Sequence, residues 1–320
     1  MKYRTLANMD EQLSAVGLGC MGMSDFYGER NDADSMATLH RALDLGINFW
    51  DTADYYGRGA NEELIASVLS ENRSKIFLAT KFAARDSVPG DVTSPPTIDN
   101  SPEWIIKAVD LSLRRLKADY IDLYYLHVYN PQWPLEETIG VMSGLVKSGK
   151  VKYLGVSNLS AEDLRKAHSV HPIAAIQNEY SLLHREDERA VLPTARELGI
   201  SYVAYSPISR GIFSEKFDIN STEETDWRRF NSRFKGEHYE NNRQIAHGIS
   251  EIAKRRNITA SQLSLAWLLS KHQDMIPIPG TKKVKYIEEN SMATDIILSN
   301  EEIAEIEAMA AKFPNVGAKF

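Results

Sequence analysis

The sequence predicts an α/β fold of the (β/α)8 TIM-barrel class, and two regularities of the chain point to it. Eight short apolar runs alternate with longer amphipathic segments from residue 16 onward. Several of these runs are nearly continuous, as expected of strands in a parallel sheet that is covered on both faces. The 320 residues also suffice for eight such units, since about 250 are typical of this barrel. A doubly wound open sheet is the alternative fold.

The eight predicted strands are short runs rich in residues that favour β-structure. Their C-terminal ends matter most, because the functional residues of such barrels lie there. The runs are residues 16–21, 47–53, 75–82, 120–127, 151–158, 173–180, 201–208 and 275–280.

Several amphipathic segments between the strands have recognisable helix ends. Residues 31–46 start on an Asn/Asp cap and stop at a glycine. Residues 101–118 start with Ser101 as the cap and Pro102 at the first helical position, where no N–H is needed. We therefore expect helices over these segments and over two more that follow the same pattern. Those two are residues 134–150 and 160–170.

Three stretches of the chain exceed what eight βα units need. Residues 3–16 fit a short N-terminal β-hairpin, residues 83–100 form a Pro/Ser/Asp-rich loop, and residues 209–240 form a long polar segment. We expect the two long segments to be loops at the C-terminal face of the barrel. No linker justifies a domain boundary, so we expect residues 1–320 to form one barrel domain.

The overall charge and the apolar pattern argue against several classes of protein. The formal net charge is −7 at pH 7, which does not suit binding to nucleic acid or to anionic membranes. No run approaches the ~18–20 apolar residues of a membrane span. The N-terminus lacks the apolar core of a signal peptide, so we expect a cytoplasmic protein. The single cysteine, Cys20, excludes a cysteine-based metal cluster, and we expect it to be buried and no metal to be bound.

Charged side chains stand at the ends of three consecutive predicted strands. Asp51 lies near the end of the second strand, Lys81 near the end of the third, and His127 ends the fourth. Because side chains alternate along a strand, Asp51 shares a face with Phe49, and Lys81 shares one with Phe77. A charge facing the apolar helix layer would carry a desolvation penalty of several kcal/mol. We therefore expect both charges to point into the barrel mouth and to meet there.

A tyrosine five residues after Asp51, Tyr56, completes a set of groups that suits one reaction. A phenol has a pKa of about 10 and transfers protons poorly at neutral pH. A neighbouring ammonium lowers that pKa, a carboxylate holds the ammonium in place, and a histidine can orient a substrate oxygen. Singly, each residue could be a cap, a turn former or a packing residue. Together they predict a general acid aimed at a carbonyl oxygen, with the reactive partner supplied by a cofactor.

These motifs resemble the aldo/keto reductase superfamily over nearly the whole chain. FWDTADYYG resembles the family's Asp-x-x-x-x-Tyr segment, LATKF its lysine strand and YYLH its histidine strand. LGVSN, IQNEYS, AYSPISRG and IPGTKKVKYIEEN resemble its cofactor-binding segments. GCMGMS and WRRFNSRFKGE are similar to a bacterial, fungal and plant branch of broad-specificity aldehyde and ketone reductases. The resemblance implies a barrel that uses NADPH (NADP+) to interconvert small carbonyl compounds and alcohols.

The resemblance also implies a role for each matching residue. The catalytic tetrad falls on four side chains, with the tyrosine five residues after the aspartate as the acid and Tyr55 as a pocket wall. The tetrad is Asp51, Tyr56, Lys81 and His127. Cofactor contacts are implied for Ser157, Asn158 and Gln177 (nicotinamide amide), Tyr205 (ring stacking), Ser206, Ile208 and Gly211 (diphosphate), Gly280, Thr281 and Lys282 (phosphate at a helix start), and Glu289 and Asn290 (adenine).

Some features leave parts of this interpretation open. Tyr286 stands where many relatives have an arginine, so strict preference for NADPH stays open. Arg228, Arg229 and Arg233, in a segment that resembles a loop over the cofactor, either touch phosphates or are solvated. The short C-terminal tail predicts an open pocket and broad carbonyl tolerance. Two other functions stay open: a nucleotide-binding regulatory or redox-sensing subunit, and an isomerase or aldolase with a Schiff base on Lys81.

Overall fold

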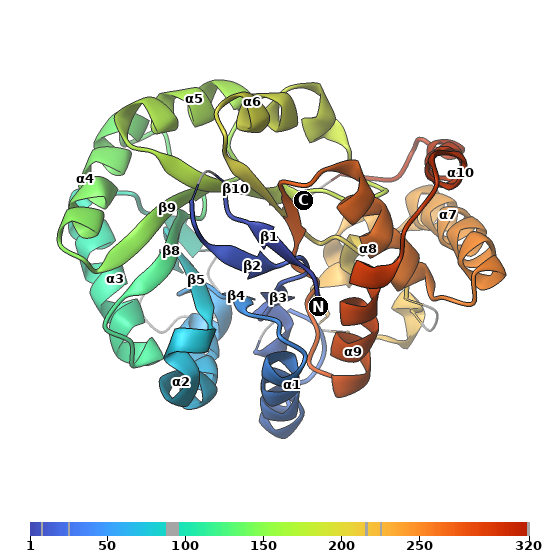
Figure 1. The fold of residues 1–320 in the computed structure, drawn as a ribbon, viewed down its shortest axis with the longest axis horizontal. Coiled ribbons are helices and arrows are strands. Elements are labelled where there is room, and N and C mark those ends of the chain that lie inside the picture. The colour runs from blue at the N-terminus through green and yellow to red at the C-terminus, as the bar shows by residue number, and fades with distance from the viewer. Residues whose placement is uncertain (8, 25, 88–95, 215–216, 225, 319–320) are drawn as a thin grey trace.

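Eight parallel strands curl into a barrel, and the long helices lie around its outside (Figure 1). The structure is a computed structural model that describes residues 1–320 apart from residues 8, 25, 88–95, 215–216, 225 and 319–320. The strands are β3 Leu18–Gly19, β4 Phe49–Asp51, β5 Phe77–Phe82, β8 Ile121–Leu126, β9 Val151–Ser157, β10 Ile173–Glu179, β11 Ser201–Tyr205 and β12 Met275–Pro277. Their order is β12-β11-β10-β9-β8-β5-β4-β3, and every neighbouring pair is parallel. Each strand lies within a predicted run, and the predicted barrel class is confirmed.

The barrel closes between its first and last strands through two glycines. Gly19 and Gly280 form a parallel bridge, and the N–H of Gly17 donates to the backbone oxygen of Pro277 at 2.9 Å. A Cβ at position 19 would lie 2.8 Å from the backbone oxygen of Ile278. This contact is too short for a side chain, so glycine at position 19 permits the two strands to approach.

The helices between the strands begin and end largely as the sequence predicts. They are α1 Asp32–Asp44, α2 Ala60–Asn72, α3 Pro102–Leu116, α4 Leu135–Lys147, α5 Ala161–Val170, α6 Val191–Glu197, α7 Gly236–Arg255, α8 Ala260–Lys271, α9 Val284–Met292 and α10 Asn300–Ala311. The side chain of Asn31 caps α1 by accepting from the N–H of Asp34 at 3.0 Å, and Ser101 caps α3. Within the part of the chain that the structure describes, no helix is long and apolar enough to cross a membrane.

Two short antiparallel hairpins accompany the barrel. β1 Tyr3–Thr5 pairs with β2 Gln12–Ser14, which confirms the predicted N-terminal hairpin. β6 Ala84–Asp86 pairs with β7 Pro96–Ile98 within the segment that the sequence predicts as a loop. The prediction was wrong at these ends because strands of three residues are too short to show an alternating apolar pattern.

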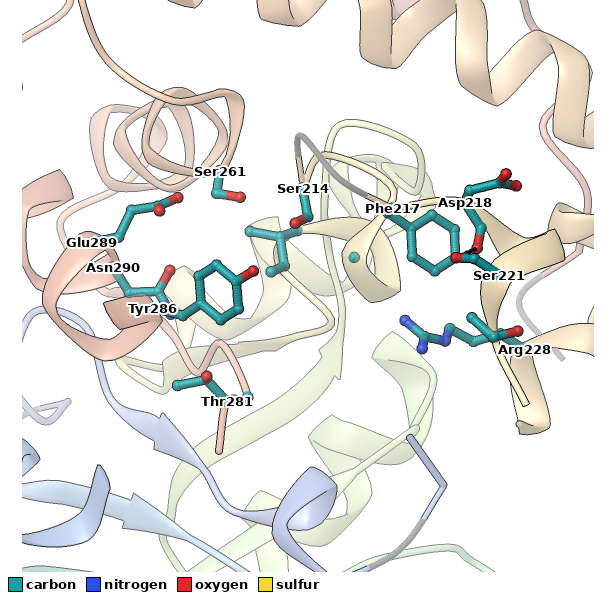
Figure 2. Close-up of a pocket in the computed structure, with 14 residues that line it drawn as sticks. Ser214, Phe217, Asp218, Ser221, Arg228, Ser261, Thr281, Tyr286, Glu289 and Asn290 are labelled. Carbon is teal, nitrogen blue, oxygen red and sulfur yellow. Dashed lines mark hydrogen bonds between the residues drawn. The ribbon is translucent and has the colours of Figure 1, made fainter. Parts of the chain in front are cut away.

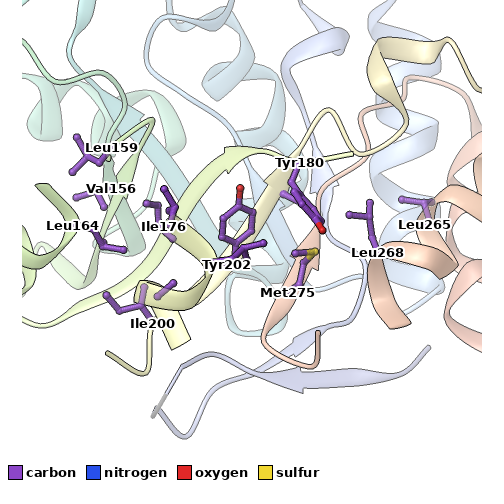
Figure 3. Packing of buried hydrophobic residues seen from close by; sticks show 14 of the residues in the cluster. Val156, Leu159, Leu164, Ile176, Tyr180, Ile200, Tyr202, Leu265, Leu268 and Met275 are labelled. Atoms are coloured by element: carbon purple, nitrogen blue, oxygen red, sulfur yellow. The ribbon is translucent and has the colours of Figure 1, made fainter. Parts of the chain in front are cut away.

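The buried apolar side chains form a lumen cluster and an outer layer on opposite faces of the sheet. Phe49, Phe77 and Leu123 pack together inside the barrel. Trp50 and Tyr124, each one residue further along its strand, pack between the sheet and the helices instead. Figure 3 shows part of that outer layer, with Val156, Leu159, Leu164, Ile176, Tyr180, Ile200, Tyr202, Leu265, Leu268 and Met275. The alternation on which the inward placement of Asp51 and Lys81 depends is thus present in the fold.

The first hairpin covers the N-terminal end of the barrel. Figure 1 shows it across the barrel centre, and its residues Leu6 and Leu13 are fully buried in the lumen cluster. The guanidinium of Arg4 donates to the backbone oxygens of Leu269 at 2.7 Å and His272 at 2.5 Å, at the end of α8. Since this end is filled, the opposite end, where the strands terminate, is the open one.

Candidate active site

The C-terminal ends of β4 and β5 bring a carboxylate and an ammonium into direct contact. Lys81 Nζ donates to Asp51 Oδ1 at 2.5 Å and to the backbone oxygen of Thr52 at 2.7 Å. Lys81 is fully buried and Asp51 is 2% exposed, so solvent and salt screen the pair little. The same Nζ lies 3.5 Å from the phenolic oxygen of Tyr56, the first residue of the 3₁₀ turn after β4. The two charges therefore meet, with a phenol beside them.

His127 follows β8 and faces the ring of Tyr56. The ring centroids are 5.8 Å apart and the rings are nearly perpendicular, at 84°. Removal from water, and to a smaller extent the ammonium of Lys81, lowers the pKa of His127 to about 3. The imidazole is therefore neutral at pH 7 and can donate a hydrogen bond without adding a second positive charge.

The pKa of Tyr56 moves in the direction opposite to the sequence-based expectation. Burial raises this pKa well above its usual value, and the charge of Asp51 raises it further. We expected the ammonium of Lys81 to lower it. In the structure Asp51 neutralises that ammonium at 2.5 Å, while the phenol itself is removed from water. The phenol is consequently protonated at neutral pH.

A hydrogen-bond network joins the ends of β9, β10 and β11 to Asp51. Gln177 Nε2 donates to Asp51 Oδ2 at 2.8 Å, and Ser157 Oγ donates to the backbone oxygen of Gln177 at 2.7 Å. Asn158 Nδ2 donates to Ser157 Oγ at 2.9 Å, and the Tyr205 hydroxyl donates to Asn158 Oδ1 at 2.9 Å. The four residues that the resemblance assigns to the nicotinamide end thus form one connected set with a tetrad residue.

These side chains line a cavity of about 490 Å³ at the open end of the barrel. Its volume falls in the range of ligand pockets. Lys81 does not line it, whereas Tyr55 does, next to Tyr56. The other predicted residues that line it are Asp51, His127, Ser157, Asn158, Gln177, Tyr205, Ser206, Ile208, Gly211, Gly280, Thr281 and Lys282.

A second cavity of about 330 Å³ adjoins the first. Figure 2 shows it between a wall that carries Tyr286, Glu289 and Asn290 and a wall that carries Phe217 and Arg228. The residues that line both cavities are Ile208, Gly211, Arg228, Gly280 and Thr281. The two cavities thus form an elongated groove that runs from Tyr56 to the start of α9.

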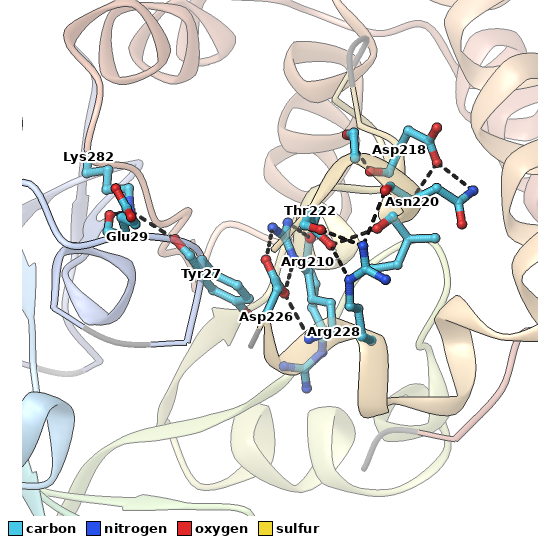
Figure 4. Close-up of polar contacts among 12 residues, drawn as sticks. Tyr27, Glu29, Arg210, Asp218, Asn220, Thr222, Asp226, Arg228 and Lys282 are labelled. Carbon is cyan, nitrogen blue, oxygen red and sulfur yellow. Dashed lines mark hydrogen bonds and ion pairs between the residues drawn. The ribbon is translucent and has the colours of Figure 1, made fainter. Parts of the chain in front are cut away.

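Lys282 lies at the edge of the first cavity and is held by the loop after β3. Its Nζ donates to the backbone oxygen of Tyr27 at 2.9 Å and to that of Glu29 (Figure 4). Lys283 pairs with Asp34 on α1. These contacts hold the predicted phosphate-binding cation against a segment that the sequence analysis did not connect with it.

Arg228 lies across the groove between two aromatic rings. Its guanidinium carbon is 4.9 Å from the centroid of Tyr27 and 4.7 Å from that of Phe217. Asp226 accepts two hydrogen bonds from it, at 2.9 and 2.7 Å (Figure 4). Arg228 is thus held by Asp226 and is not freely solvated. It lines both cavities and so lies within reach of a ligand in the groove.

The other two arginines of this segment have structural contacts. Arg229 donates to the backbone oxygen of Thr222 at 2.5 Å. Arg233 is fully buried and pairs with Glu179, which also pairs with Arg210 at 3.2 Å. Both predicted alternatives, a phosphate ligand or a solvated side chain, are wrong for Arg233. A buried carboxylate at the end of β10 requires a counter-ion, but the pair is 54 residues apart in sequence and no local pattern reveals it.

Two further groups of cavity residues were not assigned from the sequence. Met21, Phe26 and Tyr27 follow β3, and Trp227 lies in the long polar segment. The N–H of Trp227 donates to the backbone oxygen of Phe26 at 3.4 Å, which joins the two segments over the cavity. For the first group the available signal was the GCMGMS motif, residues 19–24, which extends past the end of the first predicted strand at residue 21.

Known proteins share both the sequence and the fold of this chain. The model of the aldo/keto reductase family matches residues 15–311. An NADP(+) aldo-keto reductase of Schizosaccharomyces pombe, yakc, is 40% identical over 317 residues, which cover 97% of this chain and 92% of that protein. The glycerol dehydrogenase of Gluconobacter oxydans is similar with a TM-score of 0.89 and 28% identity, over 100% of this chain and 98% of its own. An aldo/keto reductase of Klebsiella pneumoniae in complex with NADP and acetate gives 0.74 and 26%, over 98% and 96%. The chain therefore belongs to the aldo/keto reductase family of oxidoreductases.

Proposed function

We propose that the protein reduces aldehydes and ketones to alcohols, with NADPH as its cofactor. The observation that carries the proposal is the contact of the Lys81 ammonium with Asp51, beside a protonated Tyr56, at the mouth of a ligand-sized cavity. The raised pKa keeps the phenol protonated but makes it a weaker acid, so Lys81 would have to stabilise the phenolate as the proton leaves. Family membership supports the same class of reaction.

Four side chains would divide the work of transferring the proton and orienting the substrate. Tyr56 would give its proton to the carbonyl oxygen of the substrate. Lys81, with its Nζ 3.5 Å from the phenolic oxygen, would stabilise the phenolate that remains. Asp51 holds the ammonium in position through a bond of 2.5 Å. His127, as a neutral donor on the other side of Tyr56, would orient the carbonyl oxygen.

The groove suits a long anionic dinucleotide. Its two cavities run from the predicted tetrad to α9, and among the described residues three cations line it: Arg210, which pairs with Glu179, Arg228 and Lys282. A Cβ at Gly211 would lie 3.2 Å from Arg228 Nη1, so the glycine keeps this side of the groove clear. When bound, NADPH supplies the hydride for the carbonyl carbon. The residues that would hold it are Ser157, Asn158, Gln177, Tyr205, Ser206, Ile208, Gly211, Gly280, Thr281, Lys282, Glu289 and Asn290.

Names of similar proteins agree with this cofactor. The S. pombe relative carries NADP(+) in its name, and the K. pneumoniae structure contains NADP. The lining of the first cavity includes Met21, Tyr55 and Trp227. Such apolar and aromatic side chains suit small carbonyl compounds with an apolar or aromatic substituent.

The proposal is tested by NADPH oxidation with a panel of aliphatic and aromatic aldehydes and ketones. We expect turnover of several members of the panel. Silence across the panel, together with tight NADPH binding, would contradict the proposal and favour a nucleotide-sensing subunit. Borohydride trapping of a substrate on Lys81 without nicotinamide would favour an aldolase instead. The bonds from Lys81 to Asp51 and Thr52 argue against that last outcome.

A further inference from the structure

The first turn of α2 carries two adjacent polar residues, Asn61 and Glu62, that are completely buried. Burying an amide and a carboxylate is unfavourable unless each finds hydrogen-bond partners. Their partners include the residues next to Asp51 and Lys81 in the sequence. These contacts connect α2, in the helix layer, with the residues next to Asp51 and Lys81.

Asn61 holds the strand end that carries Asp51. Thr52 Oγ1 donates to Asn61 Oδ1 at 2.6 Å, and Asn61 Nδ2 donates to the backbone oxygen of Cys20 at 2.9 Å. The backbone oxygen of Thr52 is also the second acceptor of the Lys81 ammonium, at 2.7 Å. Asn61 thus forms hydrogen bonds with Thr52, whose backbone oxygen accepts from the Lys81 ammonium, and with the backbone of Cys20, directly after β3.

Glu62 holds the strand that carries Lys81. Thr80 Oγ1 donates to Glu62 Oε1 at 2.7 Å, and Arg115 Nε donates to Glu62 Oε2 at 2.6 Å. Because side chains alternate along β5, Thr80 faces the helix layer while Lys81 faces the barrel mouth. Anchoring Thr80 therefore fixes the backbone from which Lys81 extends.

The same arginine supports the turn that follows Tyr56. Gly57 and Arg58 have positive φ angles, and Gly59 has a φ of +92°. A Cβ at Gly59 would lie 2.6 Å from Arg115 Cδ, so Arg115 packs directly on this turn. The pair of Glu62 and Arg115 thus contacts β5, which carries Lys81, and the turn that begins at Tyr56.

We propose that Asn61 and Glu62 are positioning residues that hold the Lys81 ammonium in its place between Asp51 and Tyr56. The inference rests on the proposed reductase function. Neither residue lines the cavity, so neither would touch substrate or cofactor. Their contribution would be geometric: small displacements of a reacting group slow a reaction strongly while leaving ligand binding nearly unchanged.

The test removes only the hydroxyl groups that reach α2. Thr80→Val and Thr52→Val keep the shape of the side chain and delete its hydrogen bond, whereas Thr80→Ser and Thr52→Ser keep the bond. Thr38→Val is the matched control, because Thr38 is also fully buried and its hydroxyl donates only within α1, to the oxygen of Asp34 at 2.8 Å. Each variant is measured for thermal unfolding, for NADPH binding by fluorescence titration and for carbonyl reduction.

We expect the two valine variants at positions 52 and 80 to lose about 10-fold in kcat, with the Kd for NADPH and the KM for the aldehyde within about two-fold of wild type. The solvent deuterium isotope effect on kcat should rise, because proton transfer becomes slower, and serine should restore most of the rate. Thr38→Val should change none of these kinetic quantities. If wild type turns over and Thr80→Val and Thr52→Val behave like Thr38→Val, the positioning role is contradicted while the reductase function stands. If wild type reduces no carbonyl, the proposed function fails, and the positioning role fails with it.

Discussion

At the scale of single residues, removal from water sets the protonation of Tyr56 and His127. Burial is the largest cause of the raised pKa of Tyr56 and of the lowered pKa of His127. Both side chains are therefore neutral hydrogen-bond donors at pH 7. They lie beside one fully buried ion pair, that of Lys81 and Asp51. The four predicted tetrad residues thus comprise two neutral hydrogen-bond donors and one buried ion pair.

His127 gives this account a pH-dependent consequence. Its pKa is about 3 in the folded protein, against about 6.5 in an unfolded chain. The unfolded state therefore binds more protons in between, so the stability that depends on neutral His127 is complete above pH 6.5 and is lost as the pH falls toward 3. An NMR titration, with the signal assigned by comparison with His127→Asn, should show no protonation of His127 between pH 8 and pH 5. A midpoint near 6.5 would contradict the removal of this ring from water.

The contact between Asp51 and Lys81 could be predicted from the sequence because it depends on local rules, whereas the catalytic roles of the four predicted tetrad residues stay predictions. Side chains alternate along β4 and β5, and a charge that faced the apolar helix layer would carry a desolvation penalty. Both rules place Asp51 and Lys81 inside the barrel, where they pair. Arg233 could not be predicted in this way. Its partner Glu179 lies on β10, and only the folded chain brings the two together. The direction of the pKa shift of Tyr56 was also beyond the sequence, since it depends on how closely Asp51 neutralises Lys81.

At the scale of elements, the side chain of Arg4 fastens the N-terminal hairpin to the end of α8 and to β12. Arg4 donates to the backbone oxygens of Leu269, His272 and Met275, at 2.7, 2.5 and 2.6 Å. Carbonyls at a helix C-terminus have no partner within the helix and carry partial negative charge. A guanidinium is therefore well suited to satisfy them.

Replacement of this arginine should destabilise the protein without affecting the site. For Arg4→Met we expect the free energy of unfolding to fall by about 2–4 kcal/mol, because several charge-assisted hydrogen bonds are lost. Arg243→Met is the control, since Arg243 is 65% exposed and its contact with Glu240 is long, at 3.4 Å. Urea unfolding measures both variants. Equal stability of the two variants would contradict a stabilising contribution of the Arg4 hydrogen bonds.

The barrel strands were predictable as elements because each apolar run is bounded by polar or helix-forming residues. The β6–β7 hairpin was not, because its strands have three residues each and pair only with one another. The contact between the loop after β3 and the segment that contains Arg228 could not be predicted from the sequence either. A stack of Arg228 on Tyr27 joins residues that are about 200 positions apart, and no local periodicity reports such a contact.

At the scale of the whole molecule, segments far apart in the sequence converge on the groove beside the barrel strand ends. The loop after β3, the segment from β11 to α7, and the start of α9 all contribute lining residues. A ligand that fills this groove binds the folded chain only. It should therefore stabilise the fold by mass action.

NADPH should consequently raise the free energy of unfolding by about 2.7 kcal/mol when its concentration is 100 times its Kd. Thermal unfolding with increasing NADPH measures this, and NADH at the same concentrations shows how far the 2′-phosphate contributes. Because Tyr286 lines the groove at a position where the resemblance leads us to expect an arginine, the comparison also measures how strongly the groove discriminates NADPH from NADH. An unfolding temperature that does not respond to NADPH would contradict the assignment of the groove.

The most direct test of the central claim compares the two adjacent tyrosines. Tyr56→Phe and Tyr55→Phe each remove one hydroxyl from the same cavity. With saturating NADPH and an aldehyde that wild type reduces, Tyr56→Phe should lose at least about 100-fold in kcat, the lower end of what general acid catalysis contributes. Tyr55→Phe should keep its rate within a few-fold, and both variants should bind NADPH like wild type in a fluorescence titration. Equal loss of rate in the two variants, or full activity of Tyr56→Phe, would contradict Tyr56 as the proton donor.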